Sequence, residues 1–474
     1  MNWAESLYHS IEYHSKKSAF WTPRIGYVSY EELGTLVRKT QVALLRLKVS
    51  SGDYVLLLDL PGPQLYAAAI AIVSLGASIL FVEPWLPIAR INAILAQVKP
   101  KVFWSPLFGQ IWAAKVASIR CIPHWLRPAA ILHERDPQHY EAQSVAADAT
   151  AILSFTSGTS GQPKGIPRTH EYLLVVTEIL KTLDPDNLAQ ETMVIFPNLV
   201  LYHLGQGHCA YIVPPKWPDK VLRTLGQLPA ELAPKTVACG PAFLKKLLRT
   251  EGFAELRWIG VGGALLDANV LDAALKRFPK AHVDLIYGST EVEPVAHARA
   301  EVALKKSQDA ELFQITYLGE AIDEISMEQQ GDEFWVTGPH VTKEYVQAAA
   351  LDQSLKRRDS QGRIWHNMGD RIDIKADGLW YLGRSFQKRE DFELEQRIYW
   401  YLQSSHSFLV RNGRQELVLV GEGIAGKQQN ILREFPQLIH LIEAPIIRDI
   451  RHRARIDRHK TLRKVQHRID RGCL

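Results

Sequence analysis

The sequence contains little cysteine, with four in 474 residues. They lie far apart and form no C-x-x-C pair, at Cys121, Cys209, Cys239 and Cys473. This spacing excludes a compact cysteine-bound zinc site and offers no disulfide framework. Such usage is typical of a reducing compartment, so we expect a cytoplasmic protein. Residues 1–6 lack a basic region followed by an apolar run, so we also expect no signal peptide.

A strong excess of one charge is absent, because the net charge is +5. Residues 448–471 nevertheless hold ten Lys and Arg against three Asp. A basic tail of this kind can bind nucleic acid or an anionic membrane, but no nucleic-acid-binding motif accompanies it. We therefore expect a solvated helix here and no nucleic-acid partner.

Long hydrophobic runs are also scarce. Residues 65–82 are nearly uncharged over a length that could span a membrane. Gly76 divides this run into a helical pattern at 64–75 and a strand pattern at 78–82. Helix, glycine and strand in this order are usual in an α/β core. We therefore expect no transmembrane segment.

Short apolar runs alternate with helical patterns along most of the chain. The strand patterns fall at 54–60, 78–82, 101–104, 151–155, 193–196, 236–238, 258–261 and 283–286. The helical patterns between them include 30–47, 88–97, 171–180 and 242–249. This alternation predicts an α/β protein with parallel sheets flanked by helices.

The pattern changes near residue 313, after which strand-like segments become shorter and turns denser. These turns predict a small β-rich subdomain at about 313–384. The charged stretch 387–391 is a candidate hinge. We therefore expect a large N-terminal domain over 1–384, followed by a small α+β C-terminal lid domain over 385–474.

The segment from Thr156 to Gly165 predicts a phosphate-binding loop. It follows an apolar strand pattern and contains three glycines, four hydroxyl residues and one lysine. Glycines let backbone N–H groups approach phosphate oxygens, and Lys164 adds a positive charge. The segment is not the P-loop of NTPases, whose lysine is followed by Ser or Thr at the start of a helix. Here Gly165 and Pro167 disfavour a helix directly after Lys164.

This segment resembles the phosphate loop of the adenylate-forming superfamily, which comprises acyl-CoA synthetases, peptide-synthetase adenylation domains and luciferases. Further segments agree in the family's order over nearly the whole chain. The resemblance implies an enzyme that uses ATP and Mg²⁺ to convert a carboxylic acid to an acyl-adenylate, with release of pyrophosphate. It also implies a catalytic Lys164 and ATP-binding loop residues, namely Thr156, Ser157, Gly158, Thr159, Ser160 and Gly161.

A second segment of the resemblance is Tyr287-Gly288-Ser289-Thr290-Glu291, directly after the strand pattern at 283–286. By resemblance Tyr287 stacks on adenine, and the adjacent Gly288 belongs to the same nucleotide site. The Thr290 hydroxyl binds the α-phosphate, and Glu291 binds Mg²⁺. A carboxylate suits Mg²⁺, which keeps phosphate and water oxygens as its other ligands.

Three further segments complete the site that the resemblance implies. Gly262-Gly263-Ala264 corresponds to the turn that packs against adenine, so Gly263 and Ala264 are expected there. Asp370, in Met368-Gly369-Asp370, is expected to accept both ribose hydroxyls, and Arg384 is expected beside the ribose and phosphate. Residues 196–215 fall at the substrate-pocket helix, where His203 and Gly205 are candidates to face the acid. A histidine satisfied by packing is an equal alternative for His203.

The chain departs from the family at the C-terminal catalytic lysine. By position Arg455 takes its place, and a planar guanidinium is not equivalent to an ammonium group. Three alternatives follow: Arg455 performs the lysine's role, Lys460 substitutes for it, or adenylation is slowed.

A second departure concerns the acyl acceptor. Phe386 stands where most members carry an acidic or Lys residue, and no glycine occurs between Arg384 and Gly413. This argues against CoA, whose pantetheine tunnel needs a Gly-rich loop. Arg451-His452 and Pro294-Val295 are similar to segments of the β-lactone synthetases of the bacterial olefin pathway. Those enzymes adenylate a β-hydroxy fatty acid, whose own hydroxyl then closes the lactone.

Two alternatives to this function remain open. One is an acyl-CoA or acyl-carrier-protein ligase, in which the acyl group passes to a thiol. The other is a nucleotide-binding protein with impaired catalysis, which the replacement at Arg455 motivates.

Overall fold

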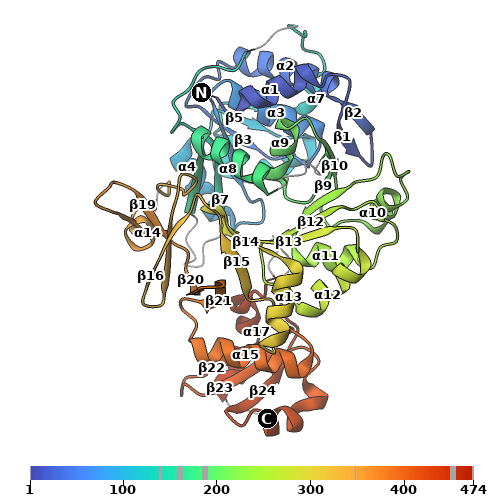
Figure 1. Ribbon diagram of the computed structural model, residues 1–474. Helices are drawn as coiled ribbons and strands as arrows, with labels where there is room; N and C mark the ends of the chain where they lie inside the picture. The colour runs from blue at the N-terminus through green and yellow to red at the C-terminus, as the bar shows by residue number, and fades with distance from the viewer. Residues whose placement is uncertain are drawn as a thin grey trace.

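The computed structural model describes residues 2–137, 141–156, 164–183, 190–346, 348–448 and 455–471. Within them the strands form four sheets, of eleven, six, four and three strands. Figure 1 shows helices packed against both larger sheets, and α8 (His170–Thr182) contacts β8 (Lys164–Thr169) of one sheet and β14 (Val292–Arg299) of the other. The α/β fold class predicted from the alternating patterns is therefore confirmed.

The eleven-stranded sheet contains the segment with Tyr287. Its order is β2-β1-β10-β9-β11-β12-β13-β14-β15-β21-β20. The strands from β1 to β13 in this order are parallel, and those after β13 pair antiparallel. Their bounds are β1 Ser18–Thr22, β2 Gly26–Ser29, β9 Glu191–Val194, β10 Cys209–Ile212, β11 Thr236–Cys239, β12 Trp258–Gly262, β13 His282–Ser289, β14 Val292–Arg299, β15 Tyr317–Ala321, β20 Asp370–Lys375 and β21 Gly378–Arg384.

The six-stranded sheet carries the two ends of the predicted phosphate loop. Its order is β6-β5-β3-β4-β7-β8, and all neighbours are parallel except β7 and β8. The bounds are β3 Tyr54–Leu57, β4 Ser78–Val82, β5 Val102–Trp104, β6 His124–Leu126, β7 Thr150–Thr156 and β8 Lys164–Thr169. Because β8 follows the loop as a strand, the expectation that no helix begins at Lys164 is confirmed.

Helices of the first 310 residues cover these sheets. Their bounds are α1 Ala4–Tyr13, α2 Tyr30–Arg46, α3 Pro63–Ser74, α4 Ile88–Val98, α5 Leu107–Ala113, α6 Ala117–Arg120, α7 Pro128–Ile131, α8 His170–Thr182, α9 Pro197–Gly205, α10 Asp219–Gly226, α11 Pro241–Leu247, α12 Ala268–Arg277 and α13 Ala300–Asp309. Helix α2 begins at a capping box in which Ser29 and Glu32 satisfy each other's backbone N–H groups. Helix α3 is buried along nearly its whole length, which explains its uniformly apolar sequence. Among the described residues, no helix is long and apolar enough to cross a membrane.

Two strands end earlier than predicted. The strand expected at 193–196 is β9, which ends at Val194, because Pro197 begins helix α9 and Phe196 is its N-cap. Proline is favoured in the first helical turn, where its missing N–H costs nothing. The strand expected at 54–60 ends at Leu57, although the N–H of Leu58 still bonds to Trp104 of the neighbouring β5.

The region after residue 313 divides between two sheets. Strands β15, β20 and β21 extend the eleven-stranded sheet, whereas β16 Ser326–Gln330, β17 Glu333–Thr337, β18 Lys356–Arg358 and β19 Ile364–Asn367 form the four-stranded sheet. The short helix α14 Ala349–Leu355 precedes β18. This segment is rich in antiparallel strands, three of which belong to the large sheet, and its standing as a subdomain stays a prediction.

Residues after Arg384 form a separate core at one end of the molecule, drawn orange to red in Figure 1. It consists of α15 Arg389–Leu402, β22 Ser407–Arg411, β23 Leu417–Gly421, α16 Gln428–Glu434, β24 Leu438–Glu443 and α17 Arg458–Arg471. Helix α17 buries Val465 and Ile469 against this sheet, so the basic tail is packed along one side. We propose that residues 385–474 act as a lid, since their sheet and core are distinct from those of residues 1–384.

Candidate active site

Two segments distant in the sequence meet where Lys164 contacts Glu291. Lys164 begins β8, and Glu291 lies in the turn between β13 and β14. The Lys164 ammonium forms an ion pair with Glu291 Oε1. Glu291 is 5% exposed. Burial is the largest influence and opposes its ionisation, but the Lys164 charge, the nearby His366 and the hydrogen bonds from Lys164 and Tyr345 together lower its pKa to about 2. Glu291 is therefore a buried carboxylate that stays ionised.

The turn that presents Glu291 requires glycine at position 288. A Cβ on Gly288 would lie 2.9 Å from the carbonyl oxygen of Val292, closer than real Cβ contacts allow. Thr290 precedes Glu291 in this turn, and its carbonyl accepts a hydrogen bond of 3.4 Å from Arg168. The turn is thus fixed by its own packing and by β8, where Arg168 lies.

Three residues that the sequence did not single out complete this cluster. The Tyr345 hydroxyl donates a hydrogen bond of 2.9 Å to Glu291 Oε1. Lys356 and His366 are both buried and face each other as register partners of β18 and β19. Burial lowers the pKa of Lys356 to about 8 and that of His366 to about 3. The available signal in the sequence was Lys356, which begins the short strand β18. A lysine that is buried in such a strand is seldom without a charged partner.

A second group joins Tyr287, Asp370 and Arg384. The Tyr287 hydroxyl donates to Asp370 Oδ2 at 2.8 Å. Arg384 Nη1 lies 2.8 Å from Asp370 Oδ1, and the two residues are Cα partners of β20 and β21. A carboxylate oxygen has two lone pairs, so Oδ1 retains the capacity to accept a further hydrogen bond beside its contact with Arg384. A buried carboxylate with a free acceptor is suited to bind hydroxyl groups.

Arg455 reaches the end of β12 from the C-terminal region. Its Nε donates a hydrogen bond of 2.8 Å to the carbonyl oxygen of Gly263. Gly263 has a φ of +87°, in the left-handed region that favours glycine, and Ala264 follows it in the same turn. Lys460, in contrast, pairs with Asp457 at 3.0 Å near the start of α17. Of these two cations, Arg455 is the one that contacts a predicted site segment.

The predicted loop is described only at its two ends. Thr156 ends β7 and Lys164 begins β8, and the two are Cα partners across this antiparallel pair. The loop residues predicted to bind ATP lie outside the described residues, namely Ser157, Gly158, Thr159, Ser160 and Gly161. The geometry of Thr156 and Lys164 shows that these residues belong to a connection between neighbouring strands.

His203 and Gly205 contact a different part of the molecule from the groups above. His203 is buried, with its Nδ1 3.3 Å from Nδ1 of His208. The carbonyl of Gly205 accepts a hydrogen bond of 2.7 Å from Ser10 of α1. These contacts correspond to the packing alternative for His203, and its place in an acid pocket stays a prediction.

The buried histidines predict a loss of stability in mild acid. Burial lowers the pKa of His203 to about 3 and that of His208 to about 4. Between these values and the unfolded value of 6.5, the unfolded chain binds protons that the folded chain does not, so stability falls as pH falls. At pH 5 the expected loss is about 2 kcal/mol per histidine. Denaturant unfolding at pH 7, 6 and 5 measures it.

The His203→Gln variant should lose stability less steeply over this pH range than the wild type. His133→Gln, a change at an exposed position, is the matched control and should leave the slope unchanged. A wild-type free energy of unfolding that is flat between pH 7 and pH 5 would contradict the prediction.

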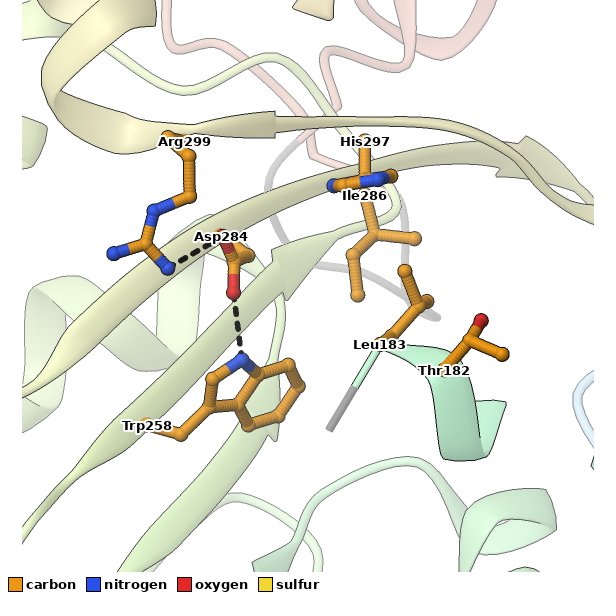
Figure 2. A pocket seen from close by; sticks show the side chains of 7 residues that line it. All are labelled: Thr182, Leu183, Trp258, Asp284, Ile286, His297 and Arg299. Atoms are coloured by element: carbon orange, nitrogen blue, oxygen red, sulfur yellow. Dashed lines mark hydrogen bonds and ion pairs between the residues drawn. The ribbon is translucent and has the colours of Figure 1, made fainter. Parts of the chain in front are cut away.

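A cavity of about 210 Å³ lies between the end of α8 and strands β12 to β14. Figure 2 shows Asp284 joined to Trp258 and to Arg299, at 2.7 and 3.3 Å. Ile286 also lines the cavity and directly precedes Tyr287 in β13. Because side chains alternate along a strand, the cavity lies on the opposite face of β13 from Tyr287 and Asp370.

The chain is similar in sequence to one protein family and to several known proteins. The sequence profile of the family described as AMP-binding enzyme matches residues 7–346. An olefin β-lactone synthetase of Xanthomonas campestris pv. campestris is 24% identical over 447 residues, covering 85% of this chain and 80% of that protein. A malformin synthetase of Aspergillus vadensis is 26% identical over 304 residues, covering 62% of this chain but only 6% of that protein.

One solved structure shares the fold across its whole length. The ATP-bound MatB of Rhodopseudomonas palustris superposes with a TM-score of 0.79 at 17% sequence identity. The match covers 99% of this chain and 100% of that protein. At this identity the likeness establishes the fold alone.

Proposed function

Since the chain belongs to the AMP-binding family of adenylate-forming enzymes, we propose that it activates a carboxylic acid with ATP. ATP-dependent adenylation of a carboxylic acid is typical of AMP-binding enzymes. The products of this step are an acyl-adenylate and pyrophosphate. The observation that carries the proposal is the buried Glu291, paired with Lys164 beside the predicted phosphate loop.

In this proposal Asp370, Tyr287 and Arg384 bind the nucleoside. The free acceptor capacity of Asp370 Oδ1 suits a ribose hydroxyl, and Arg384 compensates the buried charge. Tyr287 is fixed by its hydrogen bond to Asp370, so its ring is held for stacking on adenine. Gly263 and Ala264 flank the base on the side from which Arg455 approaches.

The residues present also fit a magnesium ion. Among the described ranges there is no group of three or more His, Cys, Asp or Glu side chains that could hold a metal by themselves. Mg²⁺ is usually bound by one or two carboxylates together with substrate phosphates, so Glu291 alone suffices when ATP supplies the rest. When bound, the ion would neutralise phosphate charge.

The acid reacts by in-line attack of one carboxylate oxygen on the α-phosphorus. An O–P bond forms there, and the bond between the α-phosphorus and the bridging oxygen breaks, so pyrophosphate leaves with the electron pair. Carboxylate and phosphate repel each other, so donors and cations must be arranged where negative charge builds. In this chain Lys164, the Thr290 hydroxyl and Arg455 serve that role.

The second step of the proposal is closure of a β-lactone by the acid's own hydroxyl. The hydroxyl oxygen attacks the acyl carbonyl, AMP leaves with the electron pair, and the hydroxyl proton passes to solvent. This step requires a hydroxyl group on the β carbon, so we propose a β-hydroxy fatty acid as the substrate. The similarity to the olefin β-lactone synthetase over most of both chains favours it, as does the short connection between Arg384 and α15, which offers no Gly-rich loop for pantetheine.

Product analysis with a 3-hydroxy fatty acid tests the proposal. Incubation with ATP and Mg²⁺ should yield a β-lactone, AMP and pyrophosphate in the absence of CoA, and adding CoA should not raise the rate. Mass spectrometry identifies the lactone, and the matching fatty acid without the hydroxyl is the control, which should stop at the adenylate. A thioester formed strictly with CoA would instead support an acyl-CoA or acyl-carrier ligase. ATP binding without exchange for any acid would support an impaired enzyme.

A further inference from the structure

Thr342 and Tyr345 hold Glu291 at its backbone and at its side chain. The Thr342 N–H donates to the Glu291 carbonyl at 2.9 Å, and the Tyr345 hydroxyl donates to the Glu291 carboxylate at 2.9 Å. We propose that Tyr345 is a positioning residue, which keeps Glu291 in its metal-binding orientation when Lys164 leaves this carboxylate for the phosphates of ATP. This inference rests on the proposed function.

In the proposed function Lys164 binds the phosphates of ATP, which would draw its ammonium away from Glu291 Oε1. Its ammonium is committed to Glu291 Oε1, and its own side chain is largely buried. Movement of Lys164 toward phosphate would leave a buried carboxylate without its ion-pair partner, which is costly unless other donors remain. The Tyr345 hydroxyl accepts a hydrogen bond of 3.4 Å from Lys164 and donates its own proton to Glu291 Oε1. Tyr345 is therefore the donor that remains on this oxygen when Lys164 moves.

Tyr345 is itself fixed by contacts that do not involve Lys164. Its backbone N–H points at the Asp352 carboxylate, with N–O distances of 2.9 and 3.2 Å. The Lys356 ammonium lies 4.8 Å from the centre of its ring and donates to the carbonyl of Thr342. A cation over an aromatic face is attractive. The Lys164 ammonium lies 4.9 Å from the centre of the same ring, so the ring keeps its contact with Lys356 when Lys164 departs.

These contacts connect Glu291, Thr342, Lys356 and Tyr345 in a ring, in which each residue contacts the next. The backbone of Glu291 is bonded to Thr342, Thr342 to Lys356, Lys356 contacts the Tyr345 ring, and the Tyr345 hydroxyl returns to the Glu291 carboxylate. A role in packing alone would be filled equally well by phenylalanine, which keeps the ring and both cation contacts. The hydroxyl is therefore the part of Tyr345 whose role can be isolated.

The test is calorimetric titration of the full chain with ATP, first in EDTA and then with excess Mg²⁺. For Tyr345→Phe we expect an ATP affinity in EDTA within about threefold of wild type. The gain in affinity on adding Mg²⁺ should fall by about tenfold, the effect of losing one hydrogen bond to a charged group. Tyr317→Phe is the matched control, because its hydroxyl donates to the Asp377 carbonyl at 2.7 Å and Lys306 lies over its ring. It should keep the full gain.

A Tyr345→Phe variant with the wild-type gain from Mg²⁺ would overturn the positioning role while leaving the proposed function intact. An equal loss of affinity in EDTA and in Mg²⁺ would also overturn it, because that pattern indicates a general structural defect. A wild-type chain that binds no ATP under either condition would instead contradict the proposed function, so the two failures are distinguishable.

Discussion

Replacing Glu291 by glutamine is expected to lower the rate of ATP–pyrophosphate exchange by about 100- to 1000-fold, the range seen when one preorganised electrostatic group is removed from an active site. Glutamine keeps the shape but loses the charge that would hold Mg²⁺. It also leaves the Lys164 and Lys356 ammonium groups around Tyr345 without their shared carboxylate. Exchange of labelled pyrophosphate into ATP, with the best acid of a panel, measures the effect.

Glu191→Gln is the control for this experiment. Glu191 is also paired with a lysine, Lys235 at 3.2 Å, but it begins β9, at the opposite end of the parallel strands from the β13–β14 turn. Its replacement should change exchange by less than about twofold, since partly exposed ion pairs contribute little. Near-wild-type exchange by Glu291→Gln would show that this carboxylate has no part in adenylation.

Arg455→Ala is expected to produce the second large effect, a loss of about 100-fold in exchange. The guanidinium contacts the Gly263 carbonyl at 2.8 Å, so its charge lies at the turn expected to flank the nucleotide. Removing a cation where negative charge develops costs several kcal/mol of transition-state stabilisation. Arg455→Lys retains the charge but not the planar fork, and we expect it to keep activity within about tenfold of wild type.

Lys460→Ala separates the alternatives for the missing lysine. Lys460 pairs with Asp457 within the start of α17, so its loss should change exchange by less than about threefold. If Arg455→Ala were fully active and Lys460→Ala inactive, Lys460 would be the substituting cation. Thermal unfolding of both variants shows whether either change acts through the stability of the C-terminal region instead.

Local sequence determined much of the architecture of this protein. The alternation of strand and helix patterns predicted the α/β fold, because hydrophobic periodicity and turn residues act over a few neighbouring positions. The strand pattern at 151–155 is β7, which ends at Thr156, the first residue of the Gly-rich segment. The segment Tyr287–Glu291, expected after a strand at 283–286, begins inside β13, which continues to Ser289. Even the absence of a helix after Lys164 followed from Gly165 and Pro167. The strand β9 ends earlier than its apolar pattern predicts, because Pro197 begins helix α9.

Tertiary structure decided which charged groups meet. Tyr345, Lys356 and His366 lie in short strands and turns with no motif, and they join Glu291 only because the four-stranded sheet packs beside the β13–β14 turn. His203 shows the converse, since its position suggested the acid pocket but its nearest polar contact is His208. Arg455 reaches Gly263 across 192 residues. The sequence by itself determined the strands, helices and loop chemistry, because these depend on neighbours in the chain. The charge balance around Glu291 required the fold, because burial and ion pairing depend on neighbours in space.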